Sequence, residues 1–187
     1  MPQDGDDLEA TALLEGLPKS AHSPEERSLK WVLCAAYIAC VSASGGALVL
    51  LSVSVHEFAE RFDTHTSQLN SIWLSKTLGG FIGVITAGFA YDKLHGARAV
   101  QLMEFAMCVN TVCLWRLPHV RTIATYHFLY MLYGFASGIS DTGGQILTRR
   151  LHGAVAGPWL AANTACFGLG AQLVIVGAAV SAGSGGT

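Results

Sequence analysis

The residues best placed to do chemistry are polar side chains within otherwise apolar stretches of the chain. Asp141 and Gln145 lie one helical turn apart in one stretch, and Asn163 lies in the next. Asp141 precedes Arg149 by eight residues, which on a helix places it about 12 Å inside the end of its stretch. A carboxylate at that depth in a bilayer costs about 2.5 kcal/mol or more unless it faces protein or water, so such residues usually mark a substrate, ion or proton path. A structural hydrogen bond between Asp141 and a neighbouring helix is the alternative interpretation.

The spacing around Asp141 indicates what its face of a helix meets. Small and polar residues recur there at steps of three, four and seven, namely His127, Gly134, Gly138, Asp141 and Gln145. Glycines and polar groups on one stripe face other helices or a cavity rather than lipid. Asn163 either lines the same cavity or makes an interhelical hydrogen bond.

Groupings that would indicate an enzyme or a metal site are incomplete. The run His56-Glu-Phe-Ala-Glu60 lacks the second histidine of the HExxH motif of zinc hydrolases, so a solvated loop is the simpler interpretation. The cysteines have no CxxC spacing and are typical of small, buried apolar residues. Because no nucleophile–base pair is evident either, we expect no enzymatic activity, no metal and no cofactor.

The composition identifies the environment that must position these residues. Of 187 residues, 51% are hydrophobic and only 13% are charged, whereas soluble domains carry about 25% charged residues. A formal net charge of -2 excludes a strongly basic nucleic-acid-binding protein. The sequence therefore predicts a membrane protein that contacts the lipid bilayer and has no nucleic-acid partner.

An acidic tail and five apolar segments organise the chain. Residues 1–28 are rich in Asp and Glu and predict a disordered cytoplasmic tail. Segments long enough to cross a bilayer as helices follow at about residues 31–55, 71–91, 97–115, 122–148 and 157–182. The sequence thus predicts an all-α, polytopic membrane helix bundle over residues 29–182, followed by a Gly/Ser-rich end at 183–187.

Charged residues at the ends of these segments predict orientation and destination. Lysine and arginine are modestly enriched on the side of the N-terminus, which we therefore expect in the cytoplasm. Lys76 falls near the opposite interface, where lysines commonly extend toward water. Glu9, Leu13 and Leu14 fit the acidic dileucine form [DE]-x-x-x-L-[LI], a sorting motif for endosomal or lysosomal membranes. The alternative is that the tail carries no sorting signal and that the protein resides in the plasma membrane.

A short basic turn joins the second and third segments. It contains, in order, Gly88, Asp92, Lys93, Gly96 and Arg98. Gly88 permits close helix contact, and Asp92 can accept hydrogen bonds from backbone donors. These residue types resemble the signature G-x-x-x-D-[RK]-x-G-[RK]-[RK] between helices 2 and 3 of the major facilitator superfamily, with one additional residue before the second glycine. The resemblance implies that this is a gating turn. In the superfamily the matching residues, here Asp92 and Arg98, help to hold helix 2 against a helix of the opposite half of the carrier.

Two further segments resemble the fucose-permease and sodium-dependent glucose-transporter branch of that superfamily. Residues 133–145 are similar to its helix 4, and the run Cys166-Phe-Gly-Leu-Gly-Ala171 is similar to its helix 5. The resemblance covers about residues 31–180 and implies the N-terminal half of the superfamily fold, in part. It also implies that Asp141 and Gln145 contact a sugar or a coupling ion. Asn163 is a third candidate by its spacing, since it lies seven residues before Gly170 and therefore on the same helix face.

The expected function is transport of a small polar solute, such as a sugar, by alternating access about a central site. Because the chain holds fewer than half of the helices of such a carrier, a missing or separate C-terminal half is the expected partner. The candidate coupling ions are Na+ and H+. The fucose-permease relatives that couple to protons also use an acid in helix 1, whereas the first segment offers Tyr37, Ser42 and Ser44 but no acid. This disfavours proton coupling through two acids and leaves sodium coupling or uncoupled facilitated movement open. The alternative function is that of a truncated, non-transporting membrane protein with a structural or regulatory role.

Overall fold

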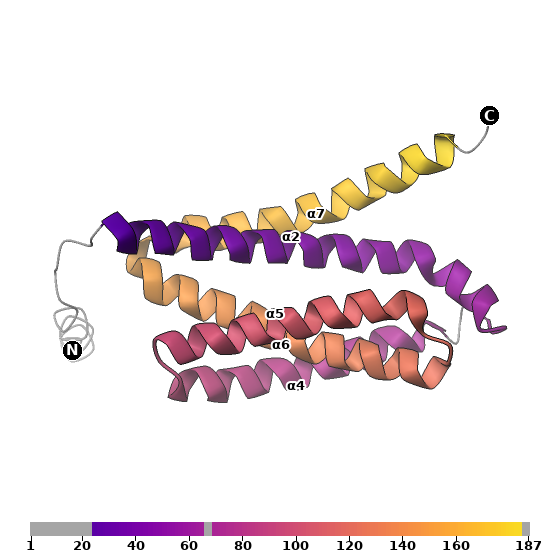
Figure 1. Ribbon diagram of the computed structural model, residues 1–187, viewed down its shortest axis with the longest axis horizontal. Helices are drawn as coiled ribbons and strands as arrows, with labels where there is room; N and C mark the ends of the chain where they lie inside the picture. Colours follow the sequence, from indigo (N-terminus) through magenta and orange to yellow (C-terminus); the bar gives the residue numbers. More distant parts are fainter. Residues whose placement is uncertain (1–23, 66–68, 185–187) are drawn as a thin grey trace, which may run out of the picture. The chain divides into compact units, whose positions relative to one another are not determined.

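Helices are the regular elements throughout residues 24–65 and 69–184, which are the residues that this computed structural model describes (Figure 1). The long helices are α2 (Pro24–Arg61), α4 (Ser71–Lys93), α5 (Ala97–Arg116), α6 (Ile123–His152) and α7 (Gly157–Ser184). Short 3-10 turns follow α5 at Leu117–His119 and α6 at Gly153–Val155. No strand occurs in these ranges, so the predicted all-α helix bundle is confirmed.

Some predictions concern residues outside the described ranges. The sorting motif of Glu9, Leu13 and Leu14 lies there, as do most of the acidic tail and residues 185–187 of the Gly/Ser-rich end. The chain divides into two units, Met1–Leu33 and Cys34–Thr187. The packing described below is that within the second unit.

Local signals explain where α6, the helix of Asp141, begins and ends. It begins after Thr122, whose side-chain oxygen accepts a hydrogen bond from the backbone N–H of Thr125 at 3.3 Å. It ends at Gly153, whose φ of +54° lies in the region that glycine adopts without a Cβ clash. The basic residues of its last turn, Arg149, Arg150 and His152, are favoured at the negative end of the helix dipole.

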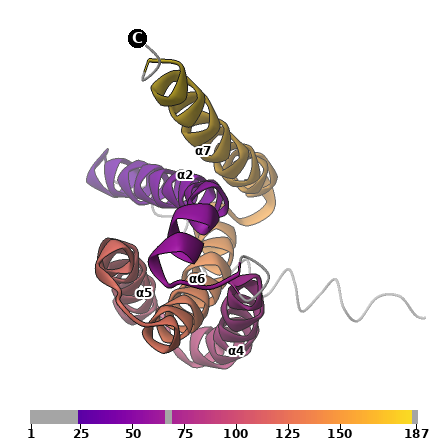
Figure 2. The ribbon, with the colours of Figure 1, turned by 90° about the vertical axis from the view of Figure 1, so that its right-hand side faces the viewer.

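α4 and α6 pack with their backbones in contact. Each helix supplies two glycines four residues apart: Gly79 and Gly83 on α4, and Gly134 and Gly138 on α6. A Cβ atom at any of these positions would overlap main-chain atoms of the other helix. Small residues at this spacing let membrane helices approach closely. Viewed along the helices, α6 lies between α4 and α5 and contacts both (Figure 2).

Two buried clusters extend this packing. In one, the fully buried Tyr91 of α4 lies with Met103 of α5 and Ile139 of α6. In the other, the ring centroids of Tyr126 and Tyr130 are 4.9 Å apart, and Phe58 of α2 lies 4.8 Å from Tyr126. Aromatic pairs at these separations add stability beyond the area they bury.

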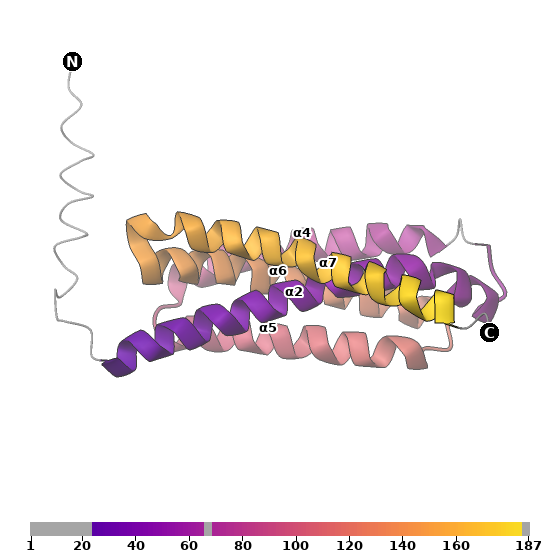
Figure 3. The ribbon, with the colours of Figure 1, turned by 90° about the horizontal axis from the view of Figure 1, so that it is seen from above.

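α2 and α7 cross each other beside this core (Figure 3). A Cβ at Gly45 of α2 would overlap the backbone of Phe167, and one at Gly170 of α7 would overlap that of Ser42. Only 6% of the most apolar stretch of α7 is buried, and Leu173 is 74% exposed. α7 therefore presents most of its apolar surface outward.

Among the described residues, two helices are long and apolar enough to cross a membrane: Ser71–Lys93 and, within α7, Gly157–Ser181. Residues Cys34–Leu50 of α2 form a shorter apolar helix. α5 and α6 are less apolar, because α5 contains Arg98 and Glu104 and the packed face of α6 is rich in tyrosine, serine and glycine. Large apolar side chains such as Phe89, at 70% exposure, lie on the outside of the bundle, as expected for helices in lipid.

Candidate functional site

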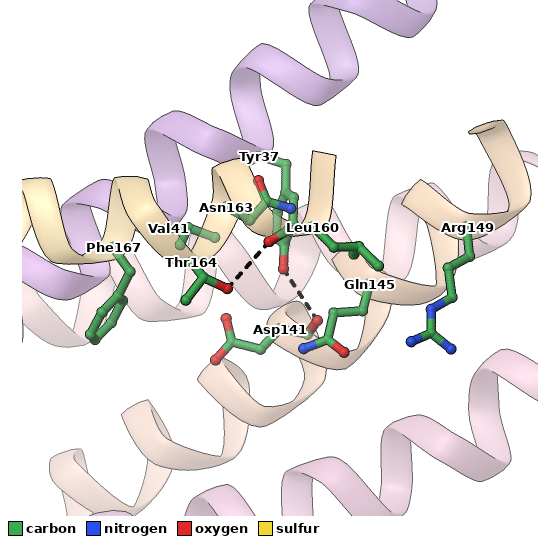
Figure 4. A pocket seen from close by; sticks show the side chains of 9 residues that line it. All are labelled: Tyr37, Val41, Asp141, Gln145, Arg149, Leu160, Asn163, Thr164 and Phe167. Atoms are coloured by element: carbon green, nitrogen blue, oxygen red, sulfur yellow. Dashed lines mark hydrogen bonds between the residues drawn. The ribbon is translucent and has the colours of Figure 1, made fainter. Parts of the chain in front are cut away.

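A cavity of about 400 Å³ opens where α2, α6 and α7 meet (Figure 4). Its wall combines apolar residues with six polar or charged ones: Tyr37, Asp141, Gln145, Arg149, Asn163 and Thr164. The three residues predicted from the sequence to contact a solute or ion, Asp141, Gln145 and Asn163, thus line one cavity. Their role in binding stays a prediction.

Asp141 faces this cavity from α6. Its Oδ2 atom accepts a hydrogen bond from the Ser137 hydroxyl, one turn earlier on the helix, at 3.4 Å. Its backbone carbonyl accepts a hydrogen bond from the Tyr37 hydroxyl of α2 at 3.2 Å. Figure 4 shows the carboxylate turned away from Tyr37. The carboxylate therefore keeps acceptor capacity for a ligand in the cavity.

The position of Tyr37 depends on a glycine of α6. A Cβ at Gly144 would overlap the Tyr37 ring, so the ring occupies the space that any other residue at 144 would fill. This contact places the Tyr37 hydroxyl beside Asp141, where it donates a hydrogen bond to the Asp141 backbone carbonyl. Sequence reasoning noted Tyr37 only as a polar residue of the first apolar segment. The Gly143-Gly144 pair one turn from Asp141 was the available signal for a bulky side chain there.

Amide and hydroxyl groups of α7 complete the wall. Asn163 is buried, at 8% exposure, and its Oδ1 atom has no hydrogen-bond partner among the described residues. A buried amide oxygen without a partner costs about 1–3 kcal/mol, and a bound hydroxyl group would remove that cost. The Thr164 hydroxyl donates to the Leu160 carbonyl at 3.2 Å and retains acceptor capacity (Figure 4).

Two cationic side chains lie in this part of the bundle. The Arg149 side chain lines the cavity two turns further along α6. On α4, the Lys76 Nζ atom lies 5.8 Å from the ring centroid of Trp73 and 5.8 Å from that of Tyr133. With carboxylate, amide, hydroxyl and guanidinium groups on one wall, the cavity can both donate and accept hydrogen bonds, as recognition of a polyhydroxy solute requires.

The polar stripe predicted on α6 faces α4 over part of its length and the cavity over the rest. Gly134 and Gly138 meet the backbone of α4, whereas Asp141 and Gln145 line the cavity. His127 also turns to α4, where its Nδ1 atom lies 2.8 Å from the Ser75 hydroxyl and its Nε2 atom 3.3 Å from that of Ser71. The stripe therefore faces helices and a cavity, and His127 is not part of the cavity wall.

The predicted gating turn connects α4 to α5 and is tied to α6. Arg150 donates hydrogen bonds to the backbone carbonyls of Tyr91, at 2.7 Å, and Leu94, at 3.0 Å. Gly96 has a φ of +57°, which favours glycine at the start of α5. Through Arg150 the turn is thus hydrogen-bonded to the end of α6, the helix that carries Asp141.

The charged residues of the turn, Asp92, Lys93 and Arg98, are exposed. The close helix contact expected at Gly88 is wrong, because a Cβ there would meet no atom within 4 Å. The glycines that bring α4 against α6 are Gly79 and Gly83 instead. The gating role of the turn stays a prediction.

Comparison of the sequence with known proteins finds relatives that are named as transporters. The chain is 26% identical over 142 residues to sodium-dependent glucose transporter 1 of Homo sapiens, covering 76% of this chain and 26% of that protein. It is 24% identical over 158 residues to the Rattus norvegicus protein of the same name, covering 84% and 32%. It is also 24% identical over 129 residues to sodium-dependent glucose transporter 1A of Mus musculus, covering 69% and 30%.

These similarities support a general relation to sugar transporters, and the relatives are named as transporters rather than enzymes, as expected from the sequence. The chain spans about a quarter to a third of the length of these relatives. No family model matches the sequence. No solved structure matches it either.

Proposed function

We propose that the chain forms part of a carrier that moves a small polar solute, specifically a sugar, across a membrane by alternating access. The observation that carries the proposal is that Asp141, Gln145 and Asn163, from two helices, line one cavity. The relatives named as glucose transporters indicate the class of solute. On this proposal the chain resembles the N-terminal half of a major facilitator superfamily carrier.

Each cavity group has a role that follows from its hydrogen-bonding chemistry. Asp141 accepts hydrogen bonds from sugar hydroxyls, and Ser137 and Tyr37 hold its side chain and backbone in place. The unpartnered Oδ1 atom of Asn163 accepts a further hydroxyl. Gln145 both donates and accepts, so it suits a hydroxyl in either orientation.

Alternating access requires that the cavity opens to the two sides of the membrane in turn. The Gly88–Arg98 turn belongs to the α4–α6 pair through Arg150, and we propose that Asp92 and Arg98 contact a complementary half of the carrier. Their exposure in this chain leaves them accessible to such a partner. The N-terminus lies in the cytoplasm on this proposal.

Sugar binding to the purified chain in lipid nanodiscs tests the site directly. Radiolabelled D-glucose should bind saturably, and Asp141→Asn should weaken binding about ten- to a hundredfold, since a hydrogen bond to a charged group contributes about 1.5–3 kcal/mol. Glu104→Gln is the matched control, because it makes the same acid-to-amide change at an exposed position of α5 outside the cavity.

Two results would contradict the proposal. If Asp141→Asn bound D-glucose as tightly as the unaltered chain, the assignment of the site would be wrong. If no variant bound D-glucose saturably, and proteoliposomes took up none even with a complementary second half co-reconstituted, the alternative of a non-transporting membrane protein would hold.

A further inference from the structure

The Arg149 guanidinium lines the cavity without a partner in the described part of the chain. It makes no hydrogen bond or ion pair with any residue there. The adjacent Arg150, by contrast, donates hydrogen bonds to the backbone carbonyls of Tyr91 and Leu94. The two arginines at the end of α6 therefore differ in role, since Arg150 attaches the α4–α5 turn while the donors of Arg149 are available to a ligand in the cavity.

Arg149 belongs to a row of polar side chains on one face of α6. Asp141, Gln145 and Arg149 follow one another at steps of four residues, each about 6 Å by helical rise. Figure 4 shows the three side chains one after another along the helix. Helical side chains lean toward the N-terminus of their helix, so the Arg149 side chain extends toward Gln145. The row thus presents a carboxylate at one end, a guanidinium at the other and an amide between them.

The charges of this row define the ligand that completes it. Asp141 and Arg149 are the charged residues of the cavity wall within the described chain, and about 12 Å of helical rise separates them. A guanidinium presents parallel N–H donors that match the two oxygens of a carboxylate. A neutral sugar leaves this pairing unused, and a phosphate ester carries nearly two negative charges against a single cation. A polyhydroxy ligand with one carboxylate matches the wall in both hydrogen bonding and charge.

We propose that the solute of this cavity is a sugar acid, a hexuronate whose carboxylate pairs with Arg149 while its ring hydroxyls bind at the Asp141 end of the wall. The inference rests on the proposed sugar-binding function and specifies the substrate class within it. Arg149 is then the residue that selects the acid over the neutral sugar. Asp141 repels an anionic group, so the ligand binds in one orientation, with its carboxylate toward Arg149.

The test compares D-glucuronate with D-glucose, two sugars that differ only at the exocyclic carbon, in binding to the chain in nanodiscs. D-glucuronate should bind about tenfold more tightly, because pairing with the guanidinium adds charge-assisted hydrogen bonds. D-glucuronamide, which has the shape of the acid without its charge, should bind no more tightly than D-glucose.

Two arginine variants assign this preference to one residue. Arg149→Met should lower the ratio of the D-glucuronate and D-glucose affinities from about ten to about one. Arg121→Met removes the same charge at an exposed position outside the cavity and should leave the ratio unchanged. If Arg149→Met does not fold, as judged by circular dichroism, Arg149→Gln makes the same comparison with a polar, uncharged side chain.

The inference is overturned if D-glucuronate binds no more tightly than D-glucuronamide, or if the Arg149 variants keep the preference for the acid. Tighter binding of a phosphate ester of D-glucose than of D-glucuronate would contradict the match to a single negative charge. Saturable binding of D-glucose without a preference for the acid overturns this inference and leaves the proposed function standing. Absence of binding by all of these sugars overturns both.

Discussion

The contact of α4 with α6 predicts that two glycine-to-alanine changes have opposite consequences. Gly134→Ala places a Cβ atom against the carbonyl of Lys76 and the amide nitrogen of Gly80. These are main-chain atoms, so they cannot rotate away and the helices must separate. Gly88→Ala adds the same methyl group to α4 at a position where no atom lies within 4 Å.

The difference between the two variants isolates the cost of the contact. Both gain the same helix propensity from alanine, so this contribution cancels in the comparison. Overpacking a tight site costs about 1–3 kcal/mol, and we expect Gly134→Ala to be less stable than Gly88→Ala by that amount. Separation of the helices also weakens the neighbouring contacts at Gly79 and Gly138, which favours the upper part of the range.

Denaturant titration of the chain in detergent micelles, followed by circular dichroism, measures this difference. The unaltered chain provides the reference for both variants. Equal stability of Gly134→Ala and Gly88→Ala, within about 0.5 kcal/mol, would show that the helices are not in backbone contact. The glycine spacing would then have no structural role in joining α4 to α6.

Two other variants test contacts around the cavity. Tyr37→Phe keeps the ring over Gly144 but removes the hydroxyl that donates to the Asp141 carbonyl. The same titration should therefore show a free energy of unfolding lower by about 1 kcal/mol. An unchanged free energy of unfolding would mean that this hydrogen bond is not formed. Arg150→Met frees the carbonyls of Tyr91 and Leu94 and should increase amide hydrogen exchange in the turn between α4 and α5. Unchanged exchange there would contradict the attachment of the turn to α6.

The fold class was predictable because apolar length is a strong signal in a chain with few charges. α4 begins at Ser71, α5 at Ala97 and α7 at Gly157, the residues at which those apolar segments are predicted to begin. α2 continues to Arg61, beyond the predicted end of the first segment, because a helix does not stop where hydrophobicity falls. Its last turns pack through Ala59, which is buried beside Leu69 and Tyr126.

The site was predictable where its residues are unusual in their own segment. Asp141 is such a residue, and helical spacing then adds Gln145. Asn163 joins them only through the packing of α7, which spacing within one helix cannot reveal. Tyr37 and Lys76 escaped prediction for the same reason, since the space over Gly144 and the rings around the ammonium exist only in the assembled bundle.

The glycine contacts between α4 and α6 have a mechanical consequence. α4 and α6 are joined by main-chain contact at four glycines and again by Arg150 at one end. Asp141 lies on one of these helices and the Gly88–Arg98 turn follows the other, so we expect the two to move together. We therefore expect a change in the width of the cavity to require movement of α2 and α7 relative to this pair, at the crossing where Gly45 meets Phe167 and Gly170 meets Ser42.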